Sequence, residues 1–135
     1  MTIRARYSLS FAVSSTSAEE KDLGNAKWEV VSDSPNEGGV RKNVVVASAV
    51  DVELNMASVA SAKLLIVRTS PKDPTEDPVE IRVRRNNITA EQIAIVPLTG
   101  TKEGHFLLST TGLTSLYASN MGTVDMDVTL VLVGD

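Results

Sequence analysis

The amino-acid sequence predicts an all-β protein, an antiparallel β-sandwich or jelly roll with eight or nine short strands and little helix. Apolar and polar residues alternate along many short segments, which is the period of a strand with one buried face. Turn-forming residues separate these segments at intervals of roughly a dozen residues, a spacing typical of two-sheet folds. Hydrophobic residues make up 42% of the chain but aromatic residues only 4%. The core is therefore mainly aliphatic, which favours sheets, and two packed sheets are expected because a single sheet would leave one face bare.

The N-terminal part is expected to hold two strands. Apolar and polar residues alternate in phase along residues 3–13, which predicts a strand with one wet face. In the polar segment that follows, Ser17 and Glu20 have the spacing of a capping box, so a short helix is one interpretation and a mobile loop is the other. The remaining elements expected here are a strand at Lys27–Val31 and a loop at Ser34–Gly39.

The next part of the chain is predicted to contain a long, interrupted strand and a buried one. Val40–Met56 is long for one strand, so we expect a bend or bulge near Ser48 that splits it in two. Ala62–Thr69 is a continuous apolar run, which is typical of a strand buried on both faces. The apolar residues expected on one side of the split strand are Val44, Val46, Val50, Val52, Leu54 and Met56.

A proline-rich loop and several short strands are expected next. Pro71–Pro78 contains three prolines and cannot be ladder or helix, because proline lacks the donor and fixes φ. Asn86 and Asn87 suit a tight turn that needs positive φ. The predicted strands are Val79–Arg85, Gln92–Leu98, His105–Ser109 and Leu113–Ser119, with turns at Gly100–Gly104 and Asn120–Gly122.

The C-terminal segment, Val124–Val133, is the strand around which the others are expected to pack. Its even positions are apolar throughout, whereas its odd positions change from acidic at Asp125 and Asp127 to apolar at Val131 and Val133. A strand covered on one face at its start and on both faces at its end belongs in the middle of a packed sheet.

Length, charge and cysteine content restrict the class of protein. The 135 residues suit a single domain at 1–135, with residues 1–13 as an arm that engages a neighbouring subunit. The net charge of −4 argues against nucleic-acid binding, since phosphates require a basic face. No apolar run approaches the roughly 20 residues that cross a bilayer, and the N-terminal alternation does not resemble a signal peptide. With no cysteine, disulfides and thiolate metal sites are excluded. We expect a protein of the cytoplasm or of a particle assembled there.

No arrangement of residues predicts an enzyme. His105 is the only histidine, and no nucleophile elbow accompanies it. The pairs Asp125/Asp127 and Asp51/Glu53 share strand faces and could serve a hydrolase or bind a divalent cation, but a solvated sheet face is the favoured interpretation.

Three further groups of residues are candidates for binding. Asp73, Glu76 and Asp77 in the proline-rich loop are weak candidates for a metal site, because the spacing of a known calcium loop is missing, and a hydrated loop is the alternative. Arg82 and Arg84, near Arg85 and Arg68, could bind an acidic partner surface or a phosphate, but cross-strand ion pairs are the favoured interpretation. Trp28 and Tyr117 could stack on a sugar or belong to the core. No cofactor is predicted.

The order of elements from Ala62 to Asp135 resembles that of small structural proteins of tailed-bacteriophage virions. The resemblance is one of pattern and covers a little over half of the chain. The segments that carry it are the buried strand Ala62–Thr69, the charged strand Val79–Arg85, Pro97–Gly100 with its Leu-Thr-Gly ending, Phe106–Leu108, Gly112–Asn120, and the alternating C-terminal strand that ends in Gly134-Asp135.

The resemblance implies a non-enzymatic capsid decoration or cement protein located in the virion. It would bind the major capsid protein or other virion proteins and form a dimer or trimer, because such proteins gain affinity by repeating a modest interface. A neck, tail or baseplate adaptor and a carbohydrate-binding β-sandwich module are the alternatives. The interface candidates are Arg4, Arg6, Lys72, Glu76, Arg82 and Arg84, since charged groups set the register between partners.

Overall fold

The computed structural model describes residues 5–11, 26–32, 37–98 and 100–135. Ten strands and one short 3-10 helix lie in this part of the chain. The elements are β1 (Ala5–Phe11), β2 (Ala26–Ser32), β3 (Glu37–Val45), β4 (Val52–Glu53), β5 (Ala62–Pro71), β6 (Ile81–Arg85), η1 (Thr89–Glu91), β7 (Ile93–Ile95), β8 (Gly104–Leu113), β9 (Leu116–Asn120) and β10 (Met126–Gly134).

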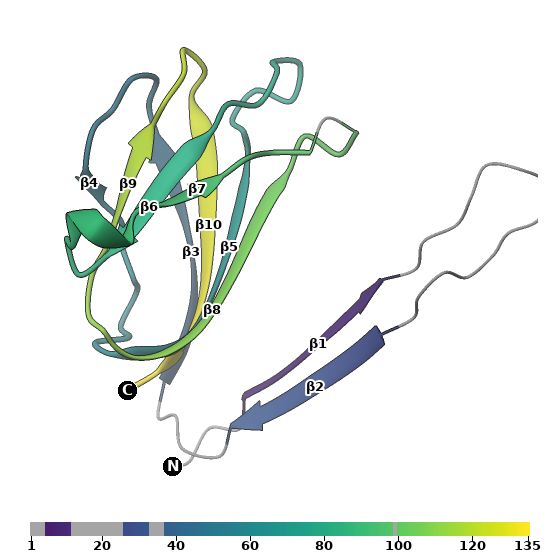
Figure 1. Ribbon diagram of the computed structural model, residues 1–135, viewed down its shortest axis with the longest axis vertical. Coiled ribbons are helices and arrows are strands. Elements are labelled where there is room, and N and C mark those ends of the chain that lie inside the picture. The colour runs from purple at the N-terminus through teal and green to yellow at the C-terminus, as the bar shows by residue number, and fades with distance from the viewer. Residues whose placement is uncertain (1–4, 12–25, 33–36, 99) are drawn as a thin grey trace, which may run out of the picture.

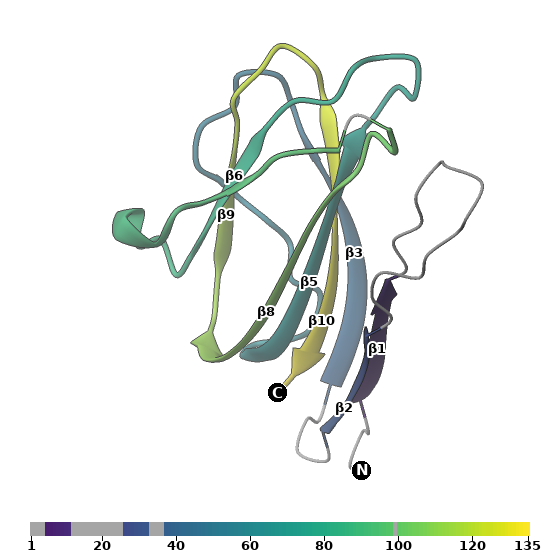
Figure 2. The ribbon, with the colours of Figure 1, turned by 45° about the vertical axis from the view of Figure 1, so that its right-hand side comes forward.

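Eight strands form two packed antiparallel sheets, so the predicted all-β sandwich is confirmed (Figures 1 and 2). The strand order is β3-β10-β5-β8 in one sheet and β4-β9-β6-β7 in the other. The pairs β3·β10, β4·β9, β5·β8 and β6·β7 are nested, as if one long hairpin had been folded over between two layers. This order, with two four-stranded sheets, is that of a jelly roll.

The core lies between the two sheets and is aliphatic, as the composition predicted. β10 sends every second side chain inward, and these four are completely buried. They pack in one cluster with residues of β5, β6 and β9. Burial of each such side chain contributes about 1.5–3 kcal/mol. The four buried residues of β10 are Met126, Val128, Leu130 and Leu132.

The predicted central position of the C-terminal strand is confirmed, because β10 pairs with β3 on one side and β5 on the other. The prediction of cover on both faces is wrong. Val131 faces outward and keeps 36% of its surface exposed. Ile66 on β5 is likewise only half-buried, although Leu65 and Val67 are fully buried. The reason is that the second sheet packs against the inner face alone.

The bend near Ser48 is confirmed, since β3 ends at Val45 and Ser48 has a positive φ of 61°. The predicted side for the residues around it is wrong in part. The register with β10 pairs Val45 with the inward Met126, so Val45 is buried and its even-numbered neighbours Val44 and Val46 are exposed. Beyond the bend the phase changes. Val50 and Val52 remain exposed, whereas Leu54 and Met56 enter the core.

Several boundaries differ from those predicted. β3 begins at Glu37 inside the predicted loop, because its glycines pair with the end of β10. β8 spans ten residues where five were expected, and β7 only three. The turn at Asn86 and Asn87 is confirmed by φ values of 51° and 59°. The alternatives for the segment after β1, helix or loop, fall on residues 12–25, outside the described part.

β1 and β2 form a separate two-stranded sheet. Their register pairs Tyr7 with Val30 and Leu9 with Trp28. Figure 1 shows this hairpin leading away from the sandwich. Both predicted N-terminal strands are therefore present, whereas the division into one domain with an arm stays a prediction.

The fully buried Leu130 provides a test of the core. Leu130→Ala should lower the free energy of unfolding by about 2–5 kcal/mol, because it leaves a cavity between the sheets. The matched control is Leu98→Ala, at a side chain that is 65% exposed, and it should change stability by no more than about 0.5 kcal/mol. Urea denaturation followed by circular dichroism measures both. Equal losses would contradict the assignment of the core.

Candidate functional site

Four loops meet at one end of the jelly roll, and we call this surface the loop end. It comprises residues 46–51, 72–80, 96–98 with 100–103, and 121–125, which join β3 to β4, β5 to β6, β7 to β8 and β9 to β10. Figure 1 shows these connections together at the top of the sandwich. The nested strand order causes this, because alternate connections of a jelly roll fall at the same end.

Hydrogen bonds tie these loops to one another. The Ser48 amide donates to the Gly122 carbonyl at 3.0 Å, and the Lys72 amide donates to the Asp125 carbonyl at 2.9 Å. The Asp125 carboxylate accepts from the Ala47 amide at 2.8 Å. Lys102 reaches the Glu76 carbonyl at 3.1 Å. The loop end is thus held in one arrangement before any partner arrives.

The loop end exposes large apolar side chains. Apolar residues gathered on a surface mark sites of interaction more reliably than scattered ones do. Here they come from three of the four loops, and the fourth carries charged residues, among them Lys72 and Glu76, which are both exposed. The exposed apolar residues are Val46, Val50, Val96, Leu98 and Met121.

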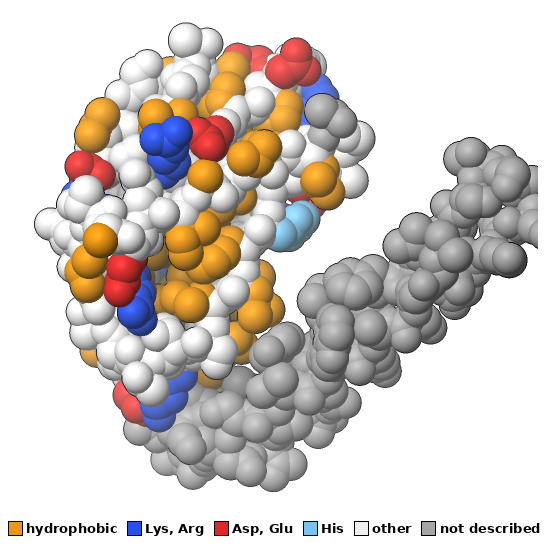
Figure 3. Space-filling model, in the orientation of Figure 1, with side chains coloured by type: hydrophobic (Ala, Val, Ile, Leu, Met, Phe, Trp, Pro, Cys, Tyr) orange, Lys and Arg blue, Asp and Glu red, His pale blue; other side chains and the backbone are white. Residues whose placement is uncertain are grey.

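A pocket of about 500 Å³ opens between the two sheets on another side of the molecule. It lies where β6, η1 and β7 of one sheet face β8 of the other, and Figure 3 shows apolar side chains gathered in this hollow. Its apolar lining comes from both sheets: Val83, Ile93 and Leu116 from one, and Phe106 and Leu108 from the other.

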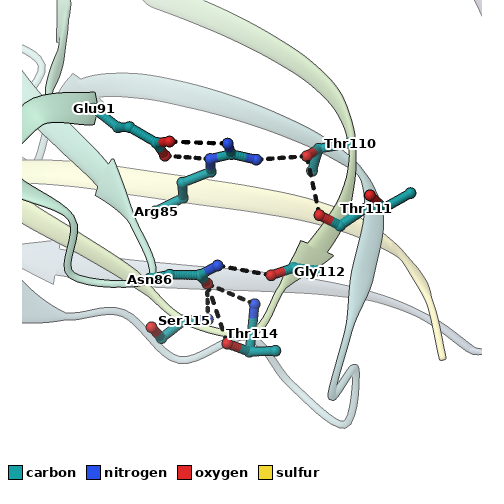
Figure 4. Close-up of polar contacts among 8 residues, drawn as sticks. All are labelled: Arg85, Asn86, Glu91, Thr110, Thr111, Gly112, Thr114 and Ser115. Atoms are coloured by element: carbon teal, nitrogen blue, oxygen red, sulfur yellow. Dashed lines mark hydrogen bonds and ion pairs between the residues drawn. The ribbon is translucent and has the colours of Figure 1, made fainter.

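An ion pair lies at this pocket (Figure 4). The Arg85 guanidinium donates two hydrogen bonds to the Glu91 carboxylate, one of them at 3.0 Å, and a third to the Thr110 hydroxyl at 2.7 Å. These contacts join β6, η1 and β8. The hydrogen bonds from Arg85 lower the pKa of the Glu91 carboxyl and raise the pKa of the Arg85 guanidinium. Both groups therefore stay charged at neutral pH.

The Asn86 side chain holds the connection between β8 and β9 in place (Figure 4). Its side-chain amide donates to the Gly112 carbonyl at 2.7 Å, and its carbonyl oxygen accepts from the amides of Thr114 and Ser115 at 2.8 and 3.2 Å. The turn predicted from Asn86 and Asn87 thus holds the connection between β8 and β9. The turn also brings Glu91 back to Arg85. This ion pair was not predicted from the sequence, although two opposite charges six residues apart across a predicted tight turn were a usable signal.

The arginines of β6 have different surroundings. Arg84 is only 13% exposed, forms an ion pair with Asp51 at 3.2 Å, and lies 5.8 Å from the centre of the Tyr117 ring. Arg82 is 40% exposed and contacts Glu80 at 3.2 Å. Both arginines therefore form ion pairs within the molecule, but these are not the cross-strand pairs expected, because Glu80 precedes Arg82 on the same segment and Asp51 lies in the loop before β4. Of the two arginines, Arg82 remains the more available to a partner, and their role at an interface stays a prediction.

The acidic loop is organised around its own hydrogen bonds. Asp73 accepts from the amide and the hydroxyl of Thr75 at 2.9 and 2.7 Å, and these bonds lower the pKa of Asp73. Lys102 supplies a positive charge here, contacting the Pro74 carbonyl at 3.3 Å and Asp77 at 3.9 Å. Within the described ranges, no three His, Asp or Glu residues are grouped so as to hold a metal ion.

The other acidic candidates take part in structural contacts. Asp125 belongs to the loop end, as described above. Asp127 is almost buried on the outer face and pairs with Lys42 at 3.0 Å. Asp51 pairs with Arg84 and also accepts from the Ser119 hydroxyl at 3.3 Å. Each of these acids thus has a neighbouring donor that explains its position.

The histidine and the aromatic candidates lie far from one another in the strand order. His105 is exposed at the start of the edge strand β8, where it lies 3.5 Å from Glu103. Tyr117 is half-buried on β9, beside Arg84. Trp28 and Arg6 occupy strand positions opposite Leu9 and Val31, respectively, in the hairpin. Arg4 lies outside the described residues.

Comparison of the chain with protein-family models, with curated proteins and with solved structures finds no match in any of the three. The resemblance to phage structural proteins therefore stays a prediction. In the described part of the chain, no helix has the length and apolar character needed to span a membrane.

The ion pair at the pocket predicts a pH-dependent stability. Because the pKa of Glu91 is lowered by folding, its contribution is complete above the ordinary pKa of a glutamate and is lost as pH falls through the lowered value. Glu91→Gln should therefore reduce stability at about pH 6 and have a smaller effect at about pH 3. Urea midpoints measure this, with Glu53→Gln in the short strand β4 as the control. A pH-independent effect would contradict the role of the ion pair.

The contacts of Asn86 lead to a second prediction. Asn86→Ala should lower the free energy of unfolding by about 1–3 kcal/mol, since it leaves the partners on the β8–β9 connection without their hydrogen bonds. Asn87→Ala is the matched control, because it places alanine at a similar positive φ and leaves this network intact, although it removes the hydrogen bond that Asn87 accepts from Arg84. Thermal unfolding compares the two, and an equal or smaller loss for Asn86→Ala would contradict the role of the Asn86 network.

Proposed function

We propose that this chain is a non-enzymatic structural protein of a tailed-phage virion, a decoration or cement protein that stabilises the head shell. It acts through repeated contacts with the major capsid protein or with other virion proteins. The observation that carries the proposal is the loop end, with its exposed apolar side chains and charged neighbours. A hydrogen-bonded end of a rigid sandwich loses little conformational entropy when it docks, which favours binding.

The architecture supports the proposal by analogy. Jelly rolls of two four-stranded sheets are common among viral capsid domains, and also among lectins. One fold serves many functions, so the analogy has to be joined to a site. The lectin-like alternative depended in part on an open Tyr117 ring, and the contact with Arg84 covers part of that ring. An adaptor of the phage neck or tail would use the same surface, and the particle fraction that binds the chain distinguishes it.

Charge contributes to the proposed contact through the interface candidates. Lys72 and Glu76 lie on the loop end itself. Arg82 is the second residue of β6, next to that end, and is more exposed than Arg84. Charges at the rim of an interface steer association and set register more than they add affinity. Arg82 is therefore expected to influence the rate of binding, whereas the apolar residues provide most of the affinity.

The test of the proposal is binding to phage heads. Purified full-length chain is mixed with heads of the phage that encodes it, and head-bound chain is measured after sedimentation. Val96→Lys should weaken binding about tenfold or more, because an unpaired charge is desolvated in the contact. Thr111→Lys, at an exposed position of β8 outside the loop end, is the control for added charge. Failure of the unmodified chain to bind heads or any other virion fraction would refute the proposal.

The contribution of Arg82 is tested in the same assay. Arg82→Glu should slow association, and the effect should diminish as salt rises, because salt screens exposed charges. In the double variant Glu80→Arg/Arg82→Glu the two charges are swapped. This variant keeps a local ion pair and the net charge but moves the positive group from position 82 to position 80. Arg41→Glu, at an exposed arginine of β3, is the control for a change of charge. If Arg82→Glu binds heads at an unchanged rate, Arg82 does not belong to the interface.

A further inference from the structure

The outer face of the sheet formed by β3, β10, β5 and β8 carries a continuous row of aliphatic residues, which we call the apolar row. Val131 on β10 pairs with Val40 on β3 and with Ile66 on β5, and Ile66 pairs with Leu107 on β8. The row thus crosses all four strands. The exposed fractions are 60% for Val40, 36% for Val131 and 40% for Leu107, while Ile66 is half-buried.

The apolar row continues on one side and ends in charge on the other. On one side, the next outward pair is Val133 with Leu64, two positions along the strands from Val131 and Ile66. Both residues of this pair are half-buried, so they widen the apolar surface. In the opposite direction the next row is polar: Lys42, Thr129, Arg68 and His105. The solvent-facing side of a sandwich strand is normally polar, so an aliphatic row of this kind indicates a surface that another element covers.

The β1–β2 hairpin has complementary properties. It pairs with no strand of the sandwich, and an isolated two-stranded hairpin is marginally stable in water. Its sequence alternates, and its register places apolar positions opposite one another: Tyr7 with Val30, and Leu9 with Trp28. Its strands of seven residues are about 23 Å long, which is enough to cross a four-stranded sheet about 14 Å wide.

We propose that the β1–β2 hairpin of one copy packs on the apolar row of a second copy, so that the chain assembles by exchanging its N-terminal arms. The second copy is favoured over the hairpin's own sandwich because the hairpin leads away from that sandwich (Figure 1). Exchange of an identical element is a low-cost route to an oligomer. This inference rests on the proposed assembly role and identifies the surface by which the chain binds itself.

The first test is the mass of the full chain in solution at about 1 and 100 µM, by light scattering, a range that spans ordinary affinities of oligomers. The unmodified chain should be larger than a monomer at the higher concentration. Val131→Lys should weaken self-association at least about tenfold, because it places a charge in the apolar contact. Leu107→Lys is a second variant of the same row, in case one of the two fails to fold, and circular dichroism checks both. A monomer at both concentrations would overturn the proposal.

The second test identifies the occupant of the apolar row. The chain has no cysteine, so two single variants, Leu9→Cys and Val131→Cys, can be mixed and oxidised. A disulfide between the two different chains is the expected result. A double variant that carries both cysteines is oxidised in parallel. Two outcomes overturn the proposal. In the first, the double variant forms a disulfide within one chain while the mixed single variants form none; in the second, Val131→Cys forms a disulfide only with another copy of Val131→Cys. The first would place the hairpin on its own sandwich, and the second would place row against row.

The two proposals fail independently. Val96→Lys should leave self-association unchanged while it weakens head binding, because it lies at the loop end. Val131→Lys should weaken self-association but leave head binding at saturating concentration unchanged, because each monomer can still occupy a site on the head. Loss of head binding by the unmodified chain would refute the decoration role alone. Loss of the disulfide between chains would refute arm exchange alone.

Discussion

The position of β10 between β3 and β5 is the constraint on which the rest of the structure depends. The hydrogen bonds of β10 join the last strand of the sandwich to β3, its first strand, and to β5. Its inward residues Leu130 and Leu132 fill the space between the sheets. These contacts join residues far apart in the sequence, so the closing of the sandwich requires the whole nested order to be in place. Such non-local pairing is expected to make folding slow for a domain of this size.

The same nesting positions both proposed surfaces. Folding one long hairpin between two layers collects four connections at one end, which creates the loop end. It also leaves one face of the β3-β10-β5-β8 sheet without a second layer, which exposes the apolar row. The surface proposed to bind a larger shell and the surface proposed to bind a second copy are thus consequences of one topology. Their separation, one at an end and one on a face, allows a single chain to make both contacts at once.

The polar contacts support these surfaces and take little part in them. Arg85, Asn86 and Asp125 each hold a connection in place through hydrogen bonds to groups of other elements. Arg84, the most enclosed of the three β6 arginines, lies against Asp51 and Tyr117. Arg84 and Arg85 therefore take part in contacts within the molecule, and the proposed contacts with partners are mainly apolar. This division suits the proposed decoration role, in which a rigid surface docks on other proteins.

The sequence by itself determined the fold class, the strand at the C-terminus and the turn at Asn86, because these depend on local period and backbone preference. Only the tertiary structure decided which face the residues on either side of the Ser48 bend took. Val45 points inward because its register with Met126 requires it, and a shift of one residue reverses every side chain of a strand. The exposure of Val131 could not be predicted either. The sequence pattern shows that a side chain is apolar, but it does not show which element covers that side chain. Cover is a property of the partner, and here we infer that the partner is another chain.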